Sequence, residues 1–161
     1  MPQTVSCSAC AVLVCLAFTF AAGCVMGAPM TPQVIQESGT HSFNAPYAKV
    51  FAATEGALKS EGYPIAISQP DKGLIKTGQK IIKAVARGYG SSSSYRAEAV
   101  GIARQYVVHV SRSGATTVVS AEPRIFQGNA DLSDKPVWDL DSPQGERALW
   151  EGLFRDIQEV L

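Results

Sequence analysis

The chain has 161 residues, with 14 basic and 14 acidic side chains. This balance excludes the bulk positive field with which many proteins attract nucleic acid, so we predict no nucleic-acid partner. The segment from Cys24 to Leu161 is long enough for one domain that folds around its own core without disulfides or metals.

The start of the chain has the character of a secretory signal. No residue from Met1 to Gln36 carries a charged side chain, and residues 11–22, AVLVCLAFTFAA, form an apolar run that small residues follow. All four cysteines lie in this head, and a body without cysteine after Cys24 suits a non-reducing compartment.

The tetrapeptide Ala21-Ala22-Gly23-Cys24 resembles the lipobox of bacterial lipoproteins, in which a peptidase cuts before a cysteine that then receives diacylglycerol. The resemblance implies a signal peptide over residues 1–23, lipidation of Cys24 and anchoring in the cell envelope. Because Val25 rather than Asp follows the cysteine, it also implies the outer membrane, facing the periplasm. Two alternatives stay open: ordinary cleavage after Ala28, and an uncleaved membrane helix over residues 9–28.

Residues 24–41 contain two prolines, two glycines and no sustained period, which predicts a flexible tether. A single α+β domain over residues 42–161 is expected to follow. Its first helix should begin after Asn44, a good N-cap, and end at Gly62, since Pro64 prevents its continuation. The predicted apolar face repeats at spacings of three and four residues and comprises Tyr47, Val50, Phe51, Thr54 and Leu58.

Two extended runs should follow this helix, joined by a turn over Pro70-Asp71-Lys72-Gly73. The second run changes phase near Gly78, where adjacent Ile81 and Ile82 predict a bulge or a break. A flexible loop over residues 88–94, GYGSSSS, comes next.

A strand from Gln105 and a returning strand over residues 116–127 should pair as a hairpin. Alternation places two sets of side chains on one face: Tyr106, Val108 and Val110 on the first strand, and Thr117, Val119 and Ala121 on the second.

A last helix is expected after residues 128–142, capped by Ser142 with Pro143 in its first position. Its apolar stripe comprises Leu149, Trp150, Leu153, Phe154, Ile157, Val160 and Leu161. The predicted fold is therefore α+β: a three- to four-stranded antiparallel meander with two helices packed on one face. A further short strand at Ser42-Phe43 is an open alternative.

The stretch YAKVFAATEGALKSEGYPIAISQPDKGLIKT, residues 47–77, resembles the start of the helix-grip domains in NlpB/BamC-like outer-membrane assembly lipoproteins and in related uncharacterised lipoproteins. The shared features are an aromatic helix start, the EGY after the helix, and a turn of the form D-x-G-[LI]-I at residues 71–75. This resemblance implies a helix-grip fold and a non-enzymatic, membrane-tethered accessory role.

No motif predicts catalysis, a cofactor or a metal. Residues 73–80, GLIKTGQK, lack the lysine directly after the second glycine that a phosphate-binding loop needs. The two histidines, His41 and His109, lack the neighbouring ligands of a zinc site, and the aspartates after residue 130 miss the spacing of a calcium loop. We therefore predict a protein that is not an enzyme.

Charge is segregated along the chain. Residues 71–112 carry eight bases and two acids, whereas residues 113–161 carry four bases and nine acids. The basic residues form a candidate contact surface for anionic lipid, a cell-wall polymer or an acidic partner: Lys72, Lys76, Lys80, Lys83, Arg87, Arg96, Arg104 and Arg112.

The function expected from these features is that of an envelope lipoprotein whose domain makes contacts with other envelope proteins in the periplasm. The alternative is a periplasmic binding module that holds an apolar or anionic lipid-like ligand between helix and sheet. Aromatic residues could line such a cavity: Tyr47, Phe51, Trp150 and Phe154.

Overall fold

The computed structural model describes residues 27–90 and 96–161. Residues 1–23, Cys24 and most of the serine-rich loop lie outside these ranges. The elements follow in the order α1 (Pro32–Ser38), β1 (Thr40–Phe43), α2 (Tyr47–Ser60), β2 (Ile65–Gln69), the 3-10 turn η1 (Pro70–Lys72), β3 (Leu74–Thr77), β4 (Lys80–Tyr89), β5 (Arg96–Ser113), β6 (Thr116–Gln127), β7 (Ala130–Asp131) and α3 (Glu146–Glu159). None of the helices within the two described ranges is long and apolar enough to cross a membrane.

The strands form one antiparallel sheet of seven. Its main path is β1-β6-β5-β3-β2, with β4 also paired to β5 and β7 paired to β6. The predicted α+β class is confirmed, but three to four strands were too few. The difference arises because β1 and β7 pair with β6, and because one expected run is divided into β3 and β4.

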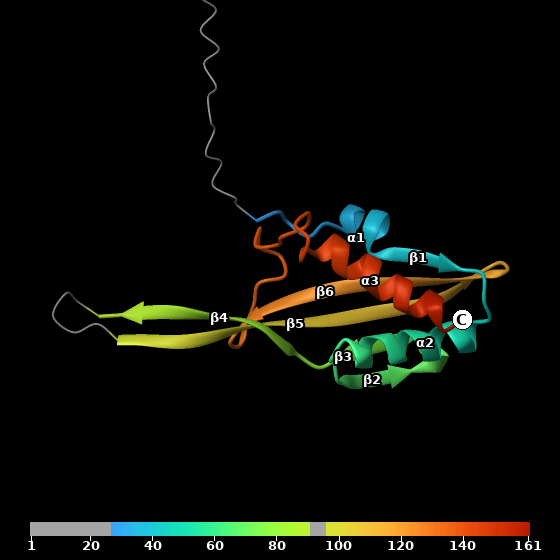
Figure 1. Cartoon of the computed structure of the whole chain (residues 1–161), viewed down its shortest axis with the longest axis horizontal. Helices are drawn as coiled ribbons and strands as arrows, with labels where there is room; N and C mark the ends of the chain where they lie inside the picture. Colours follow the sequence, from blue (N-terminus) through green and yellow to red (C-terminus); the bar gives the residue numbers. More distant parts are fainter. Residues whose placement is uncertain (1–26, 91–95) are drawn as a thin grey trace, which may run out of the picture.

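Helices α2 and α3 pack across the same face of the sheet (Figure 1). The predicted inward faces of β5 and β6 are confirmed, since all six of their side chains are buried there: Tyr106, Val108, Val110, Thr117, Val119 and Ala121. His109 points to the opposite face and is exposed. The aromatic residues proposed to line a ligand cavity instead join the packed core, with Trp150, Phe51 and Phe154 buried.

Both main helices begin later than expected, α2 by two residues and α3 by three. Pro46, not Asn44, precedes the first turn of α2, and Gly62, with φ +82°, takes the left-handed conformation just after its end. α3 begins at Glu146 because the chain before it is held in a turn. Ser142 donates to the Asp139 carboxylate from both its backbone N–H (3.2 Å) and its hydroxyl (2.6 Å).

The flexible tether expected over residues 24–41 is wrong from Pro32 onward, where α1 and β1 form. Thr31 caps α1 by accepting a hydrogen bond from the backbone N–H of Val34 at 3.2 Å. Val34 and Ile35 pack against the main core, and β1 pairs with β6, so that Thr40 lies opposite Ser120. The open alternative of a short strand at Ser42-Phe43 is confirmed as part of β1, but the segment carried no signal for its non-local pairing with β6.

The expected break near Gly78 is confirmed. β3 ends at Thr77, β4 begins at Lys80, and the register of β4 against β5 shifts between Ile81 and Lys83. The Gly78 N–H donates to the Pro64 carbonyl at 2.6 Å, so the break between β3 and β4 is held against the connection between α2 and β2.

Strands β4 and β5 extend past the rest of the sheet as an arm (Figure 1). β6 reaches along β5 only as far as Ile102, so residues 96–101 of β5 pair with β4 alone. We call this ribbon, residues 83–89 and 96–101, the hairpin arm. No strand of the described chain pairs with the outer edge of β4.

The turn predicted at residues 70–73 depends on glycine. Gly73 has φ +64°, and a Cβ there would lie 2.0 Å from the Val110 carbonyl oxygen. The two backbones are held together because the Val110 N–H donates to the Gly73 carbonyl at 2.7 Å.

We expect Gly73→Ala to lower the free energy of unfolding by roughly 3 kcal/mol, since it combines left-handed strain with a backbone clash. Gly114→Ala is the matched control: Gly114 has φ +60°, yet no atom of the described residues, its chain neighbours aside, lies within 4 Å of the added methyl group. It should cost only about 1 kcal/mol. Urea unfolding of both variants tests this, and equal losses would contradict the role assigned to the close approach.

Candidate functional site

A groove lies at the root of the hairpin arm, on the face of the sheet that carries α2 and α3. Its volume is about 790 Å³. The chain after α2, the start of β4, the strands β5 and β6, the loop before α3 and α3 itself supply its lining: Glu61, Tyr63, Lys80, Ile81, Ile82, Lys83, Ile102, Arg104, Ile125, Val137, Trp138, Asp139, Gln144 and Leu149. We call it the hairpin-root groove.

Exposed apolar side chains gather at this groove. Ile81 is 72% exposed, Val137 42% and Ile82 39%. These are three of the five large exposed hydrophobic residues found in residues 27–90 and 96–161. Single exposed apolar residues are ordinary, whereas several around one concavity mark a surface that another molecule covers.

Basic residues share the same groove. Lys80 donates from Nζ to the Glu61 carbonyl and lies over the Tyr63 ring, 4.8 Å from its centroid. Lys83 is exposed on β4. Opposite them, the exposed Asp139 is an acidic member of the lining. The β4 side of the groove is therefore basic and apolar, a combination typical of binding surfaces for amphiphilic partners.

The inner end of the groove is built on a buried ion pair. Arg104 Nη2 lies 3.1 Å from Glu146 Oε2, and the Glu146 side chain is completely buried. The Tyr106 hydroxyl donates to the other carboxylate oxygen of Glu146. Tyr106 meets Tyr63 edge-on, with ring centroids 5.1 Å apart. The network ties α3 to β5 at the point where the hairpin arm leaves the core.

Burial controls the proton affinities in this network. It raises the pKa of the Glu146 carboxyl, and the Arg104 guanidinium and the Tyr106 hydroxyl oppose that rise only in part. Burial, followed by the nearby Glu146 charge, raises the pKa of Tyr106 well above its ordinary value. Burial also raises the pKa of Glu61 beside the groove.

Of the eight predicted contact residues, the structure brings only Lys80, Lys83 and Arg104 to one groove. Arg104 is wrong as a surface residue, since its side chain is only 12% exposed and is paired with Glu146. Lys76 lies half-buried on the opposite face of the sheet, and Arg112 covers the Tyr47 ring at 4.2 Å.

The remaining predicted residues lie elsewhere. Lys72 is exposed in η1, and Arg96 is exposed at the start of β5. Arg87 lies on β4 opposite Glu98 in the register, and Cys24 lies outside the described residues. The described positions of these residues therefore do not form one continuous basic surface.

Glu146 and Tyr106 were not predicted as partners of Arg104, although the sequence carries a signal for the pair. Arg104 has the same parity on its strand as the buried Tyr106 and Val108. Glu146 lies four residues before Trp150 on the buried face of α3. A base and an acid that both fall in core phase indicate a buried ion pair.

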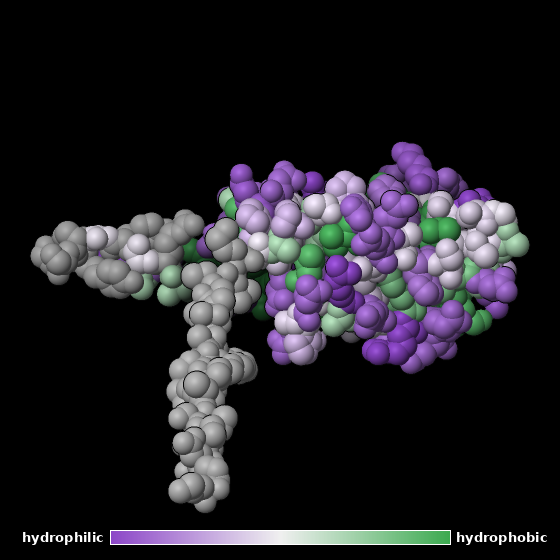
Figure 2. Space-filling model, turned by 90° about the horizontal axis from the view of Figure 1, so that it is seen from above, coloured by the Kyte–Doolittle hydropathy of each residue, from purple (hydrophilic) through white to green (hydrophobic). Residues whose placement is uncertain are grey.

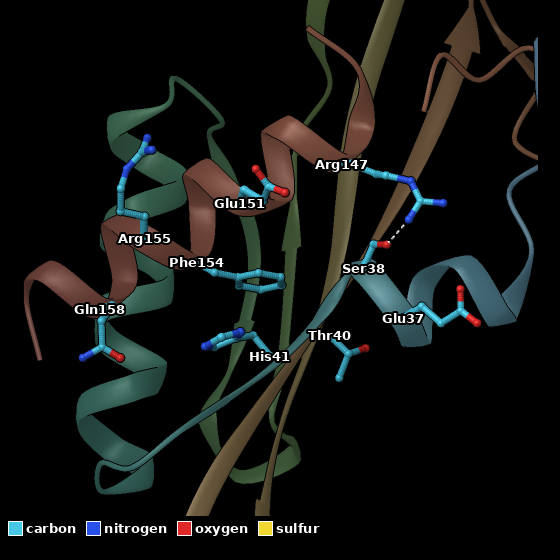
Figure 3. Close-up of a pocket in the computed structure, with 9 residues that line it drawn as sticks. All are labelled: Glu37, Ser38, Thr40, His41, Arg147, Glu151, Phe154, Arg155 and Gln158. Carbon is cyan, nitrogen blue, oxygen red and sulfur yellow. Dashed lines mark hydrogen bonds between the residues drawn. The ribbon is translucent and has the colours of Figure 1, made fainter. Parts of the chain in front are cut away.

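A second concavity, of about 490 Å³, lies between the end of α1, β1 and α3 (Figure 3). His41 stacks on Phe154 there, with ring centroids 5.3 Å apart. Arg147 donates to the Ser38 hydroxyl at 2.5 Å and pairs with Asp141 at 2.9 Å. It therefore joins the end of α1 and the loop before α3 to α3 itself. The lining of this concavity has as many acidic as basic side chains, if histidine is left aside, and its contacts hold three elements of the fold together.

Two of the aspartates after residue 130 stabilise local turns. Asp131 accepts from the N–H of Ser133 at 2.9 Å, and Asp139 accepts from Ser142. Within the parts of the chain that the structure describes, no three histidine, cysteine, aspartate or glutamate residues are grouped to hold a metal ion.

Comparison with known proteins finds a weak likeness to a solved structure. No family model and no curated protein matches the chain. A DUF4468 family protein from Bacteroides ovatus ATCC 8483 is similar over 75% of this chain and 77% of its own, with 14% identity and a TM-score of 0.34.

The raised pKa of Glu146 predicts the direction of a pH effect. The folded state binds this proton more tightly than the unfolded state does, so the stability contributed by the group is present below its ordinary pKa and is lost as the pH rises through the folded value. The free energy of unfolding of the natural chain should therefore fall, relative to that of Glu146→Gln, between about pH 4 and pH 8.

Urea unfolding of both chains across that range gives the difference directly, and the pKa shifts of Asp131 and Asp139, to which Glu146 does not contribute, cancel in it. Glu151→Gln, at an exposed position of the same helix, is the control and should give a flat difference. A difference that grows with pH would show that attraction to Arg104 outweighs burial.

Proposed function

We propose that this protein is a non-enzymatic lipoprotein of the bacterial cell envelope. Lipid on Cys24 holds it in the outer membrane, and its domain makes contacts with other envelope proteins in the periplasm. The lipobox-like tetrapeptide and the resemblance of residues 47–77 to outer-membrane assembly lipoproteins support this reading.

The backbone around Ala28 favours the anchor over ordinary cleavage. The Ala28 N–H donates to the Trp138 carbonyl at 2.8 Å, and the Trp138 N–H donates back at 3.1 Å. Cleavage after Ala28 would remove this pairing, at roughly 1 kcal/mol for each hydrogen bond. Cleavage before Cys24 leaves it intact.

The observation that carries the protein-contact proposal is the open edge of β4. Over ten residues this strand pairs only with β5 among the described strands, and most of its side chains are exposed. An unpaired strand edge presents backbone donors and acceptors to which an extended segment of another chain can add. Figure 2 shows the arm reaching away from the body, and some of the described residues visible on it are pale or green.

Charge indicates the kind of partner. β4 carries three bases, Lys80, Lys83 and Arg87, and no acid. Pairing of two β4 strands from two copies would bring these like charges together, whereas an acidic segment of a different protein would neutralise them. We therefore favour an acidic, extended partner segment over self-association.

A second candidate function is the binding of an apolar or anionic lipid-like ligand. The volume of the hairpin-root groove, about 790 Å³, lies in the range of small-molecule sites, and much of its lining is apolar.

The intact mass of the protein, extracted from its host membranes, tests the anchor. We expect a chain that begins at Cys24 and carries acyl groups. A chain that begins at Pro29 without lipid would contradict the proposal. A native mass spectrum of the same sample separates the two functions, because a ligand module should carry one further lipid molecule at fixed stoichiometry.

Site-specific photo-crosslinking in the host tests the protein contact. A benzophenone side chain at Ala86, exposed on β4, should capture a partner protein several times more often than one at Ala52. Ala52 is the matched control, since it is an exposed alanine on α2, away from the arm. Equal capture at the two positions would contradict the arm as the contact site.

A further inference from the structure

We propose that the hairpin-root groove docks on the lipid surface of the membrane that holds the Cys24 anchor. The inference rests on the proposed lipidation of Cys24 and assigns to the groove an occupant distinct from the protein partner of the arm.

The anchor lies close to the folded domain. Ala28 is already paired with Trp138 in an antiparallel bridge. Ala28 is four residues along the chain from Cys24, and a fully extended chain covers at most about 3.6 Å per residue, so the lipidated residue lies within about 14 Å of this bridge. The tether expected from the sequence would have allowed the domain to lie far from the membrane. The short segment between Cys24 and Ala28 does not allow this.

The bridge and the groove share residues. Trp138, which pairs with Ala28, also lines the hairpin-root groove, and so does its neighbour Val137. A Cβ on Gly27 would meet the backbone of Pro136 and Val137, at 2.6 Å from each, so the two segments are in close contact. Figure 1 shows the start of the described chain beside the loop that precedes α3. The groove is therefore on the anchored side of the domain.

The side chains exposed there have the chemistry of a membrane interface. Ile81, Ile82 and Val137 offer apolar surface that can enter the boundary between headgroups and acyl chains. Lys83 is exposed beside them, where its charge would meet anionic headgroups while its stem stays on apolar surface.

The position of the anchor favours a lipid surface over other partners as the occupant of the hairpin-root groove. A membrane surface is the one partner whose place relative to the domain the chain itself fixes. A second copy docked groove to groove would set Lys80 and Lys83 of each chain against those of the other. A single bound lipid would leave Ile81, at 72% exposure, still in water on the rim.

Spin labelling of the host-processed lipoprotein in vesicles tests the proposal. Because all four cysteines lie within the first 24 residues and Cys24 is blocked by lipid, one added cysteine is the single free thiol of the mature chain. Labels are placed through Ile81→Cys, Val137→Cys and the control Val160→Cys, whose parent side chain is 68% exposed at the end of α3. The vesicles contain phosphatidylcholine with or without phosphatidylglycerol.

We expect the labels at positions 81 and 137 to gain accessibility to oxygen and to lose accessibility to a water-soluble nickel chelate, while the label at 160 stays water-like. Lys83→Glu should reduce the effect at position 81 in the anionic vesicles, whereas Lys76→Glu, on the other face of the sheet, should leave it unchanged. No partner protein is present, so the protection would come from lipid.

Water-like labels at positions 81 and 137 in both kinds of vesicle would overturn the docking, although acyl groups found on Cys24 by mass would leave the anchor standing. Equal protection at position 160 would also overturn it, because no particular face would then meet the membrane. A lipid retained at fixed stoichiometry in the native mass spectrum would assign the groove to a discrete ligand instead.

Discussion

The length of β5 is the constraint on which the rest of the structure depends. Its eighteen residues, Arg96–Ser113, exceed what the core needs, so one strand serves two purposes. Its second half pairs with β3 on one edge and β6 on the other and carries the buried side chains under α2 and α3. Its first six residues, 96–101, have only β4 as a strand partner and belong to the hairpin arm.

The Arg104–Glu146 pair lies near the boundary between these two parts of β5. From Arg104 toward the C-terminal end of β5, the buried side chains pack under α2 and α3. On the other side of Arg104, residues 96–99 of the arm are exposed. A buried ion pair is weak support for stability, because removing both charges from water offsets much of their attraction. Its directional hydrogen bonds instead fix how the start of α3 meets β5, and hence how the groove and the arm are oriented relative to the core.

Local patterns in the sequence predicted much of the fold. Alternation along residues 106–110 and 117–121 identified the inward faces, and the turn ending at Gly73 and the break near Gly78 follow from residue types within a few positions. The features that could not be predicted depend on contacts between residues far apart in the sequence. β1 pairs with β6 across the length of the domain, and Val137 reaches the same groove as Ile81 from a distant loop. The basic residues of the site were visible in the sequence as a cluster of positive charge. Side chains alternate between the two faces of a sheet along each strand, so residues clustered in the sequence do not all lie on one face.

A short connection to the membrane changes what a lipid anchor does. A long flexible tether raises the local concentration of a domain and leaves its orientation free. Here the backbone is already paired at Ala28, so an anchor on Cys24 would limit rotation as well as distance. The side of the domain that bears Trp138 would then face the lipid, and the arm that starts at the same groove would run from the membrane surface toward a partner. Apolar exposure at the groove, a liability on a free domain, is stabilising on a domain held in this way.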